Sequence, residues 1–231
     1  MKKRTIFIII GIVAVVAAIA IGVGVSVVLD LQQEKLLREE IENIENLDIT
    51  KDRYNTAIKT KGDYAKVEES IKKFLDDYAV LIQDTLRIIE DERLQTMLSI
   101  ENYQQDGKDF TSSKEYLTST KETFNTNMQK LAFMTSEESV MSYINNKDLD
   151  EYYIDLYREL ALGKNAKEEL EKSAADLESA KDTFNNLLDT ELNVLNFLSE
   201  NQDQWSLTDT NILFDNTTLL LQYNLLLANL K

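Results

Sequence analysis

The chain contains no cysteine, no histidine and no proline, and only six of its 231 residues are glycine. The absence of cysteine excludes disulfides and thiolate chemistry, and the absence of histidine excludes imidazole catalysis and histidine-ligated metals. At average usage a chain of this length would carry roughly eleven or twelve prolines. Because few residues here favour turns, we expect the chain to be nearly all helix.

Carboxylates, lysine, tyrosine, serine and threonine remain as candidate catalytic groups. The 41 acidic residues outnumber the 25 basic ones, which gives a net charge of −16 and repels nucleic acid. With so many carboxylates, a pair at any chosen spacing carries little information. A calcium-loop template matches Asp148, Asp150 and Glu159, but Tyr152 and Tyr153 occupy its fifth and sixth positions. We therefore expect no enzymatic activity, cofactor, metal site or nucleic-acid partner.

An uncharged run over residues 6–29 follows Lys2, Lys3 and Arg4. As a helix it would span roughly 36 Å, against about 30 Å for the hydrocarbon core of a bilayer. Secretory signal peptides have a shorter apolar stretch, so we interpret this run as an uncleaved signal anchor. Basic residues before it and mainly acidic residues after it place the N-terminus in the cytoplasm. Residues 1–5 are then a cytoplasmic tail, residues 6–29 contact membrane lipid, and the rest lies outside the cell membrane.

Small residues recur at every fourth position of this run: Ala14, Ala18, Gly22 and Ser26. This spacing lets two transmembrane helices approach closely, and it would support a homodimer through that face. The alternative is ordinary anchor composition, which is generally rich in small residues.

The outer part is predicted to be all-α, with a helical stalk over residues 30–60 and an elongated antiparallel bundle over residues 61–231. Gly62, Gly107 and Gly163 each stand where an apolar helical pattern stops, and a helix-start signal follows each of them. A stalk helix is expected to end near residue 46, and a shorter helix or a continuation of it is expected over residues 50–59. The remaining helices are expected at residues 63–105, 112–134, 136–145, 148–162, 165–201 and 216–230.

Two of these segments carry apolar residues at alternating spacings of three and four, which is typical of a helix with one buried face. In the segment 165–201 this pattern is interrupted by Lys181 and Glu191. The last segment has leucines on several faces, so we expect it to be buried centrally or covered by a partner and to close the bundle.

Before that last helix, Trp205 and Leu207, then Ile212 and Phe214, alternate about a polar turn. Alternation of this kind predicts a small β-hairpin, which would have to lie on the bundle because an isolated hairpin is marginally stable. The alternative is a loop in which Trp205 fills the core.

Four of the ten tyrosines lie within fifteen residues: Tyr143, Tyr152, Tyr153 and Tyr157. Rigid amphipathic rings at a junction of short helices are candidates for partner binding. The alternative is that Tyr153 and Tyr157 pack inward while the other two cover the helix junction.

The sequence therefore favours a membrane-anchored, non-enzymatic protein with an interaction or structural role at a bacterial cell surface. Its lysine-, isoleucine- and asparagine-rich composition is typical of low-GC Gram-positive bacteria, and in general it resembles single-pass surface proteins with helical outer domains. Its partner would be another membrane or surface protein. The alternative is an extracytoplasmic ligand-sensing bundle. A sensor with so short a cytoplasmic tail would have to signal through a partner membrane protein.

Overall fold

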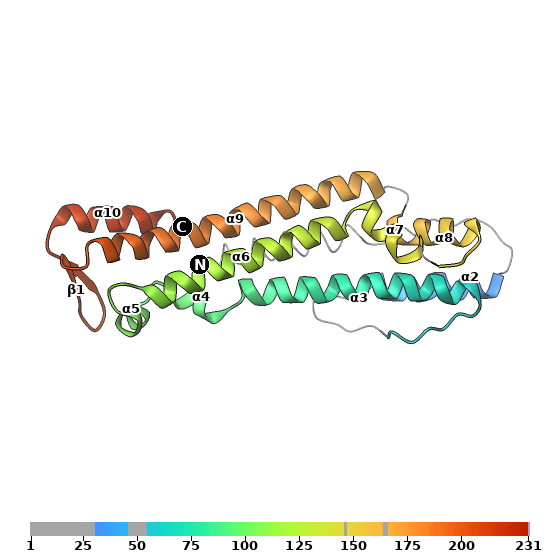
Figure 1. The fold of residues 1–231 in the computed structure, drawn as a ribbon, viewed down its shortest axis with the longest axis horizontal. Helices are drawn as coiled ribbons and strands as arrows, with labels where there is room; N and C mark the ends of the chain where they lie inside the picture. The colour runs from blue at the N-terminus through green and yellow to red at the C-terminus, as the bar shows by residue number, and fades with distance from the viewer. Residues whose placement is uncertain (1–30, 46–54, 146, 164–165, 231) are drawn as a thin grey trace. The chain divides into compact units, whose positions relative to one another are not determined.

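The computed structural model describes residues 31–45, 55–145, 147–163 and 166–230, which are mostly helical, with a two-stranded hairpin near the C-terminal end (Figure 1). The predicted all-α class with a small hairpin is thus confirmed. The elements are α2 (Leu31–Glu45), α3 (Asp63–Ile89), α4 (Glu92–Thr96), α5 (Ile100–Asp106), α6 (Thr111–Met134), α7 (Glu137–Asn145), α8 (Glu151–Leu162), α9 (Ala166–Glu200), β1 (Trp205–Leu207), β2 (Ile212–Phe214) and α10 (Thr217–Ala228).

The predicted membrane span, with its small-residue face Ala14, Ala18, Gly22 and Ser26, lies outside the described residues. Among the residues that are described, no helix combines the length and the apolar character needed to cross a bilayer.

The chain divides into two compact units. The described residues of unit 1 come from Thr85–Thr126 and Ser179–Lys231, and those of unit 2 come from Ile10–Asp84 and Asn127–Glu178. Helices α3, α6 and α9 each contribute one part to each unit.

The predicted single helix over residues 63–105 is wrong, because the chain breaks twice and forms α3, α4 and α5. The Asp91 side chain accepts a hydrogen bond from the backbone N–H of Arg93 (2.8 Å), and the Ser99 side chain accepts one from that of Asn102 (3.1 Å). Each side chain satisfies a backbone donor at a new helix start, which competes with continuation of the preceding helix.

The predicted helix over residues 50–59 is absent from its described part, residues 55–59. There the Asn55 side chain accepts a hydrogen bond from the backbone N–H of Ala57 (2.9 Å), a local turn that competes with helical bonding. Two predicted helix ends are confirmed, since Gly107 and Gly163 cap α5 and α8 with φ angles of 78° and 68°. Glycine adopts this left-handed conformation without steric cost.

The core of unit 2 joins α2, α3, α7 and α8. Helix α2 contributes Leu37, Ile41 and Ile44, which are at most 4% exposed. These residues pack in one cluster with Tyr64, Val67, Ile71, Phe74, Leu75, Val140, Met141, Ile144, Leu156, Tyr157, Leu160 and Ala161.

The hairpin of unit 1 follows α9 and leads into α10 (Figure 1). Strands β1 and β2 are antiparallel and pair Trp205 with Phe214. Trp205 is buried, donates its indole N–H to the Leu198 carbonyl (2.7 Å) and stacks on Phe110 at 6.0 Å between ring centroids. The hairpin therefore forms, and Trp205 also fills the core as the alternative interpretation expected.

Central burial of the last helix is wrong for α10. Its buried residues are Leu219 and Tyr223, whereas Leu220, Leu221 and Leu225 are 41%, 58% and 68% exposed. A short helix with leucines on several faces can bury one face against the rest of its unit, and the other leucines then meet solvent.

Candidate functional site

Three side chains form a buried ion cluster in unit 2. Lys72 is 3% exposed, Glu68 is 0% exposed one turn earlier on α3, and Glu40 of α2 is 4% exposed. The Lys72 Nζ lies 2.7 Å from a Glu68 carboxylate oxygen and 2.8 Å from a Glu40 oxygen. It also donates to the backbone carbonyl of Ala57 (2.8 Å). These three acceptors match the three N–H donors of the ammonium group.

Glu68 also binds the chain that precedes α3. Its carboxylate accepts hydrogen bonds from the backbone N–H and the hydroxyl of Thr60, both at 2.8 Å, and from the backbone N–H of Lys59. Burial alone would raise the pKa of Glu68, but the bonds from Lys72 and Thr60 outweigh burial and hold that pKa below its usual value. The pKa of Glu40 is lowered in the same way by Lys59 and Lys72 against the effect of burial.

The cluster connects α2, the loop over residues 55–62 and α3. The Lys59 ammonium also pairs with Glu40, so two lysines balance the two carboxylates inside the chain. The arrangement therefore has a structural role and leaves Lys72 no unused donor for a ligand. Sequence reasoning missed it. Glu68 and Lys72 have the i, i+4 spacing of an ordinary solvent-exposed pair, and Glu40 lies 32 residues before Lys72.

A second polar group joins α2 to α8 at the surface of unit 2. Arg38 donates from Nε to Glu34 (2.9 Å) and reaches both oxygens of Glu159 at 3.4 Å. The Tyr152 hydroxyl donates to the other Glu34 oxygen (2.6 Å), and the Tyr152 ring stands edge-on to Tyr153 at 5.1 Å. The Tyr152 hydroxyl thus belongs to the same polar group as Glu34, Arg38 and Glu159.

The four predicted tyrosines lie around α7 and α8 but differ in exposure. Tyr157 is fully buried and donates to the Val140 carbonyl (2.7 Å), and the half-buried Tyr143 donates to Asp77 (3.0 Å). Tyr152 is 49% exposed, so its ring offers the largest free surface of the four. A partner-binding role for these residues stays a prediction.

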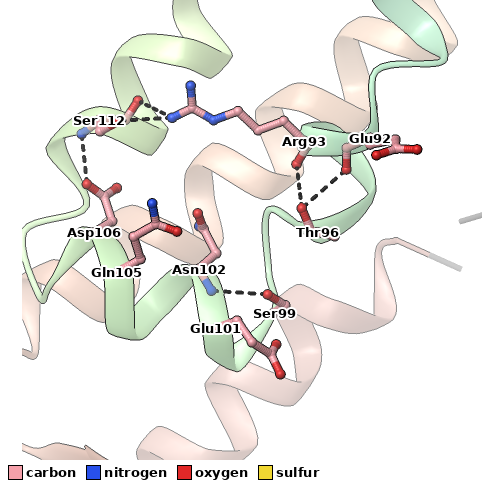
Figure 2. Close-up of a pocket in the computed structure, with 9 residues that line it drawn as sticks. All are labelled: Glu92, Arg93, Thr96, Ser99, Glu101, Asn102, Gln105, Asp106 and Ser112. Carbon is pink, nitrogen blue, oxygen red and sulfur yellow. Dashed lines mark hydrogen bonds between the residues drawn. The ribbon is translucent and has the colours of Figure 1, made fainter.

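A polar groove of about 790 Å³ lies in unit 1 along α4, α5 and the start of α6 (Figure 2). Asp106 accepts hydrogen bonds from the backbone N–H groups of Ser112 (3.1 Å) and Ser113 (2.7 Å), and Arg93 donates to the Ser112 hydroxyl (2.9 Å). The groove side chains drawn in Figure 2 are therefore largely engaged in helix caps and in bonds to one another. The lining residues are Glu92, Arg93, Thr96, Ser99, Glu101, Asn102, Gln105, Asp106 and Ser112.

No group of three or more acidic side chains within the described residues is placed to hold a metal ion. Asp148 and Asp150, which matched the calcium-loop template, are exposed, and Glu159 is engaged with Arg38.

One buried carboxyl has no partner. Glu191 of α9 is 0% exposed, and neither of its carboxylate oxygens has a hydrogen-bond partner. Burial raises its pKa to about 8. The sequence did carry a signal for this residue, since Glu191 interrupts the apolar face of its helix.

Comparisons with protein-family models, with curated proteins and with solved structures found no match for this chain.

Proposed function

We propose that this chain is a single-pass membrane protein whose helical bundle lies outside the cell membrane of a Gram-positive bacterium, where it has a structural or interaction role without catalysis. The observation that carries the proposal is the attachment of α2. This helix begins at Leu31, soon after the apolar run over residues 6–29, and buried contacts join it to α3, α7 and α8.

The attachment of α2 combines apolar and charged contacts. Leu37, Ile41 and Ile44 enter the unit 2 core, and burial of each such side chain contributes on the order of 1.5–3 kcal/mol. Glu40 adds the buried ion pair to Lys72, and Arg38 adds the surface pairing with α8. A helix held in this way supports a tethering role, because displacement of α2 would have to disrupt the core of unit 2.

The surface around Tyr152 is the proposed contact for a membrane or surface protein partner. Tyr152 combines an exposed ring with hydrogen bonding to Glu34, and Arg38 and Glu159 lie beside it. Aromatic rings and arginine are enriched among the residues that dominate binding energy in protein interfaces.

The alternative role, ligand sensing, would use the groove of Figure 2. Its volume suits a small molecule. However, Asp106, Ser112 and Arg93 already bond to one another or to backbone groups, so a ligand would have to displace helix caps. This cost favours the structural role.

Membrane topology is the first test, and the absence of cysteine makes it direct. A single cysteine at the exposed Glu122 should react with a membrane-impermeant maleimide in intact, wall-stripped cells. The matched control, Lys3→Cys, should react only after the membrane is opened. The opposite labelling pattern would contradict the proposed orientation.

Partner contact is the second test. A photo-crosslinking amino acid at position 152 should give a discrete adduct in intact cells, whereas the same group at Gln129, exposed on α6 of the same unit, should not. An adduct of twice the chain mass would identify a second copy as the partner. Equal adducts from both positions would refute a specific contact at Tyr152.

A further inference from the structure

The buried neighbours of Glu191 along its own helix are apolar. On α9, the residues one turn away on the same face are Leu187, Leu188, Val194 and Leu195, and each is at most 5% exposed. A carboxylate in such a place cannot exchange its hydration for protein hydrogen bonds, since neither oxygen has a partner. The closed structure therefore favours the neutral, protonated form of Glu191.

The C-terminal helix α10 reaches this region through one residue. The hydroxyls of Tyr223 and of Tyr103 on α5 lie 3.3 Å apart, and the negative charge of Glu191 acts to raise the pKa of Tyr103. Tyr103 thus joins α5 to α10 through Tyr223, and it lies within electrostatic reach of Glu191 on α9.

The attachment of α10 to the rest of its unit is slight. The buried residues of α10 are Leu219 and Tyr223, and the Tyr223 ring packs on Phe214 of β2 at 5.2 Å. Phe214 in turn packs on Phe197 of α9 at 6.2 Å. Tyr223 is therefore both a main attachment point of α10 and a neighbour of the Glu191 cluster.

The charged groups in the described part of unit 1 do not compensate Glu191. On α6, Lys121 pairs with Asp189 at a partly exposed edge of α9, and Lys114 donates to Ser199. The facing groups on α5 and α10 are tyrosines, both neutral at physiological pH with a raised pKa.

The other described elements of the unit carry charges that are exposed or bonded to other groups. Arg87 at the end of α3 is exposed, and Arg93 of α4 lies over the Tyr116 ring. Beside the hairpin, Lys108 donates to the Trp205 carbonyl. Burial is thus the cause of the raised Glu191 pKa.

We propose that Glu191 is a proton-controlled switch for α10: the neutral carboxyl lets Tyr223 and α10 close over it, and ionisation favours an open state in which α10 leaves and water reaches the carboxylate. The switch acts inside unit 1 and goes beyond the tethering role proposed above.

The pH window follows from linkage between proton binding and opening. In the closed state the Glu191 pKa is about 8, and in the open, hydrated state it returns toward the ordinary glutamate value of 4.5. Between these values the open state has released a proton that the closed state retains. The opening equilibrium constant then rises about tenfold per pH unit and levels off above pH 8. Opening is favoured at the upper end of the physiological range and suppressed in acid.

Hydrogen exchange of the full chain in a neutral detergent tests the switch. Protection factors for amides of α10, corrected for intrinsic exchange, should fall about tenfold per pH unit between pH 5 and pH 8. Amides of α6 in unit 1, residues 111–126, should keep their protection. In Glu191→Gln and in Glu191→Met, α10 protection should not depend on pH, because neither side chain ionises. The second variant covers the case in which the buried amide prevents folding.

The matched control is Glu200→Gln, which removes an exposed carboxylate from the same helix and should leave the pH dependence of wild type unchanged. Two results would overturn the proposal. One is α10 protection that has the same pH dependence in wild type and in the Glu191 variants. The other is equal loss of protection in α10 and α6, which would mean that ionisation unfolds the unit as a whole.

Discussion

Glu68 in unit 2 and Glu191 in unit 1 are both 0% exposed, yet their surroundings act on them in opposite directions. Glu68 accepts hydrogen bonds from Lys59, Thr60 and Lys72, and its pKa is lowered. Glu191 accepts none, and its pKa is raised. Burial alone therefore does not decide whether a carboxyl stays charged. The hydrogen-bond donors around the carboxyl decide whether it stays charged. They give Glu68 a structural role, whereas Glu191, which has no donor, responds to pH.

The largest expected effect on stability comes from replacing Lys72, which pairs with both Glu40 and Glu68. Lys72→Met leaves Glu68 buried without a cation and leaves Glu40 with Lys59 alone, and breaking a buried ion pair in this way typically costs about 3–5 kcal/mol of unfolding free energy. Urea denaturation followed by circular dichroism measures the loss. The matched control is the neighbouring Lys73→Met, whose side chain is 62% exposed beside Asp77 and should change stability by less than about 0.5 kcal/mol. Equal effects of the two substitutions would contradict the structural role of the cluster.

Replacing Glu191, the acid without a hydrogen-bond partner, should change the unfolding free energy in the opposite direction. The folded Glu191 pKa of about 8 exceeds the unfolded value of about 4.5, so wild type loses stability as the pH rises between these values. Glu191→Gln lacks this loss, and its stability relative to wild type should increase by about 2–3 kcal/mol between pH 5 and pH 7. Urea unfolding of both proteins at the two pH values measures the difference. A pH-independent difference would refute the buried, neutral state of Glu191.

A smaller effect on the unfolding free energy should distinguish a buried tyrosine hydroxyl that has a hydrogen-bond partner from one that has none. Tyr157 donates to the Val140 carbonyl, whereas the Tyr78 hydroxyl is buried without a hydrogen-bond partner. Tyr157→Phe should cost about 1–2 kcal/mol of unfolding free energy, and Tyr78→Phe should be neutral or slightly stabilising because it removes an unsatisfied polar group. Thermal unfolding of the two variants, each of which retains its ring, compares them directly. A larger loss for Tyr78→Phe would reverse this assignment.

Most helices could be predicted because their ends carry local signals. The ends of α5 and α8 follow from Gly107 and Gly163, and the start of α10 follows from the cap Asn216, all of which act within one turn. The two breaks after α3 escaped prediction. Leu94 and Met97 are buried and continue the apolar pattern across them, while the caps Asp91 and Ser99 are common residues on helix surfaces.

The candidate sites could be predicted less well than the fold because they depend on contacts between distant segments. The ion cluster needs Glu40 beside Lys72, and the Tyr152 surface needs Glu34 of α2, 118 residues earlier in the chain. In the sequence, Glu191 interrupts the apolar face predicted for the helix over residues 165–201. Whether such a residue finds a donor is decided by the helices that pack against it, which a sequence pattern does not specify.

Trp205 is the single tryptophan of the chain, and it lies in unit 1, stacked on Phe110 with its indole N–H bonded to the Leu198 carbonyl. When the protein is excited near the red edge of its absorbance, tryptophan is selectively excited. The fluorescence emission therefore comes from Trp205. Its spectrum follows the hydration of unit 1, whereas circular dichroism follows the helices of both units. If Lys72→Met melts unit 2 first, ellipticity should fall before the emission shifts, and the two optical signals would report the order in which the units unfold.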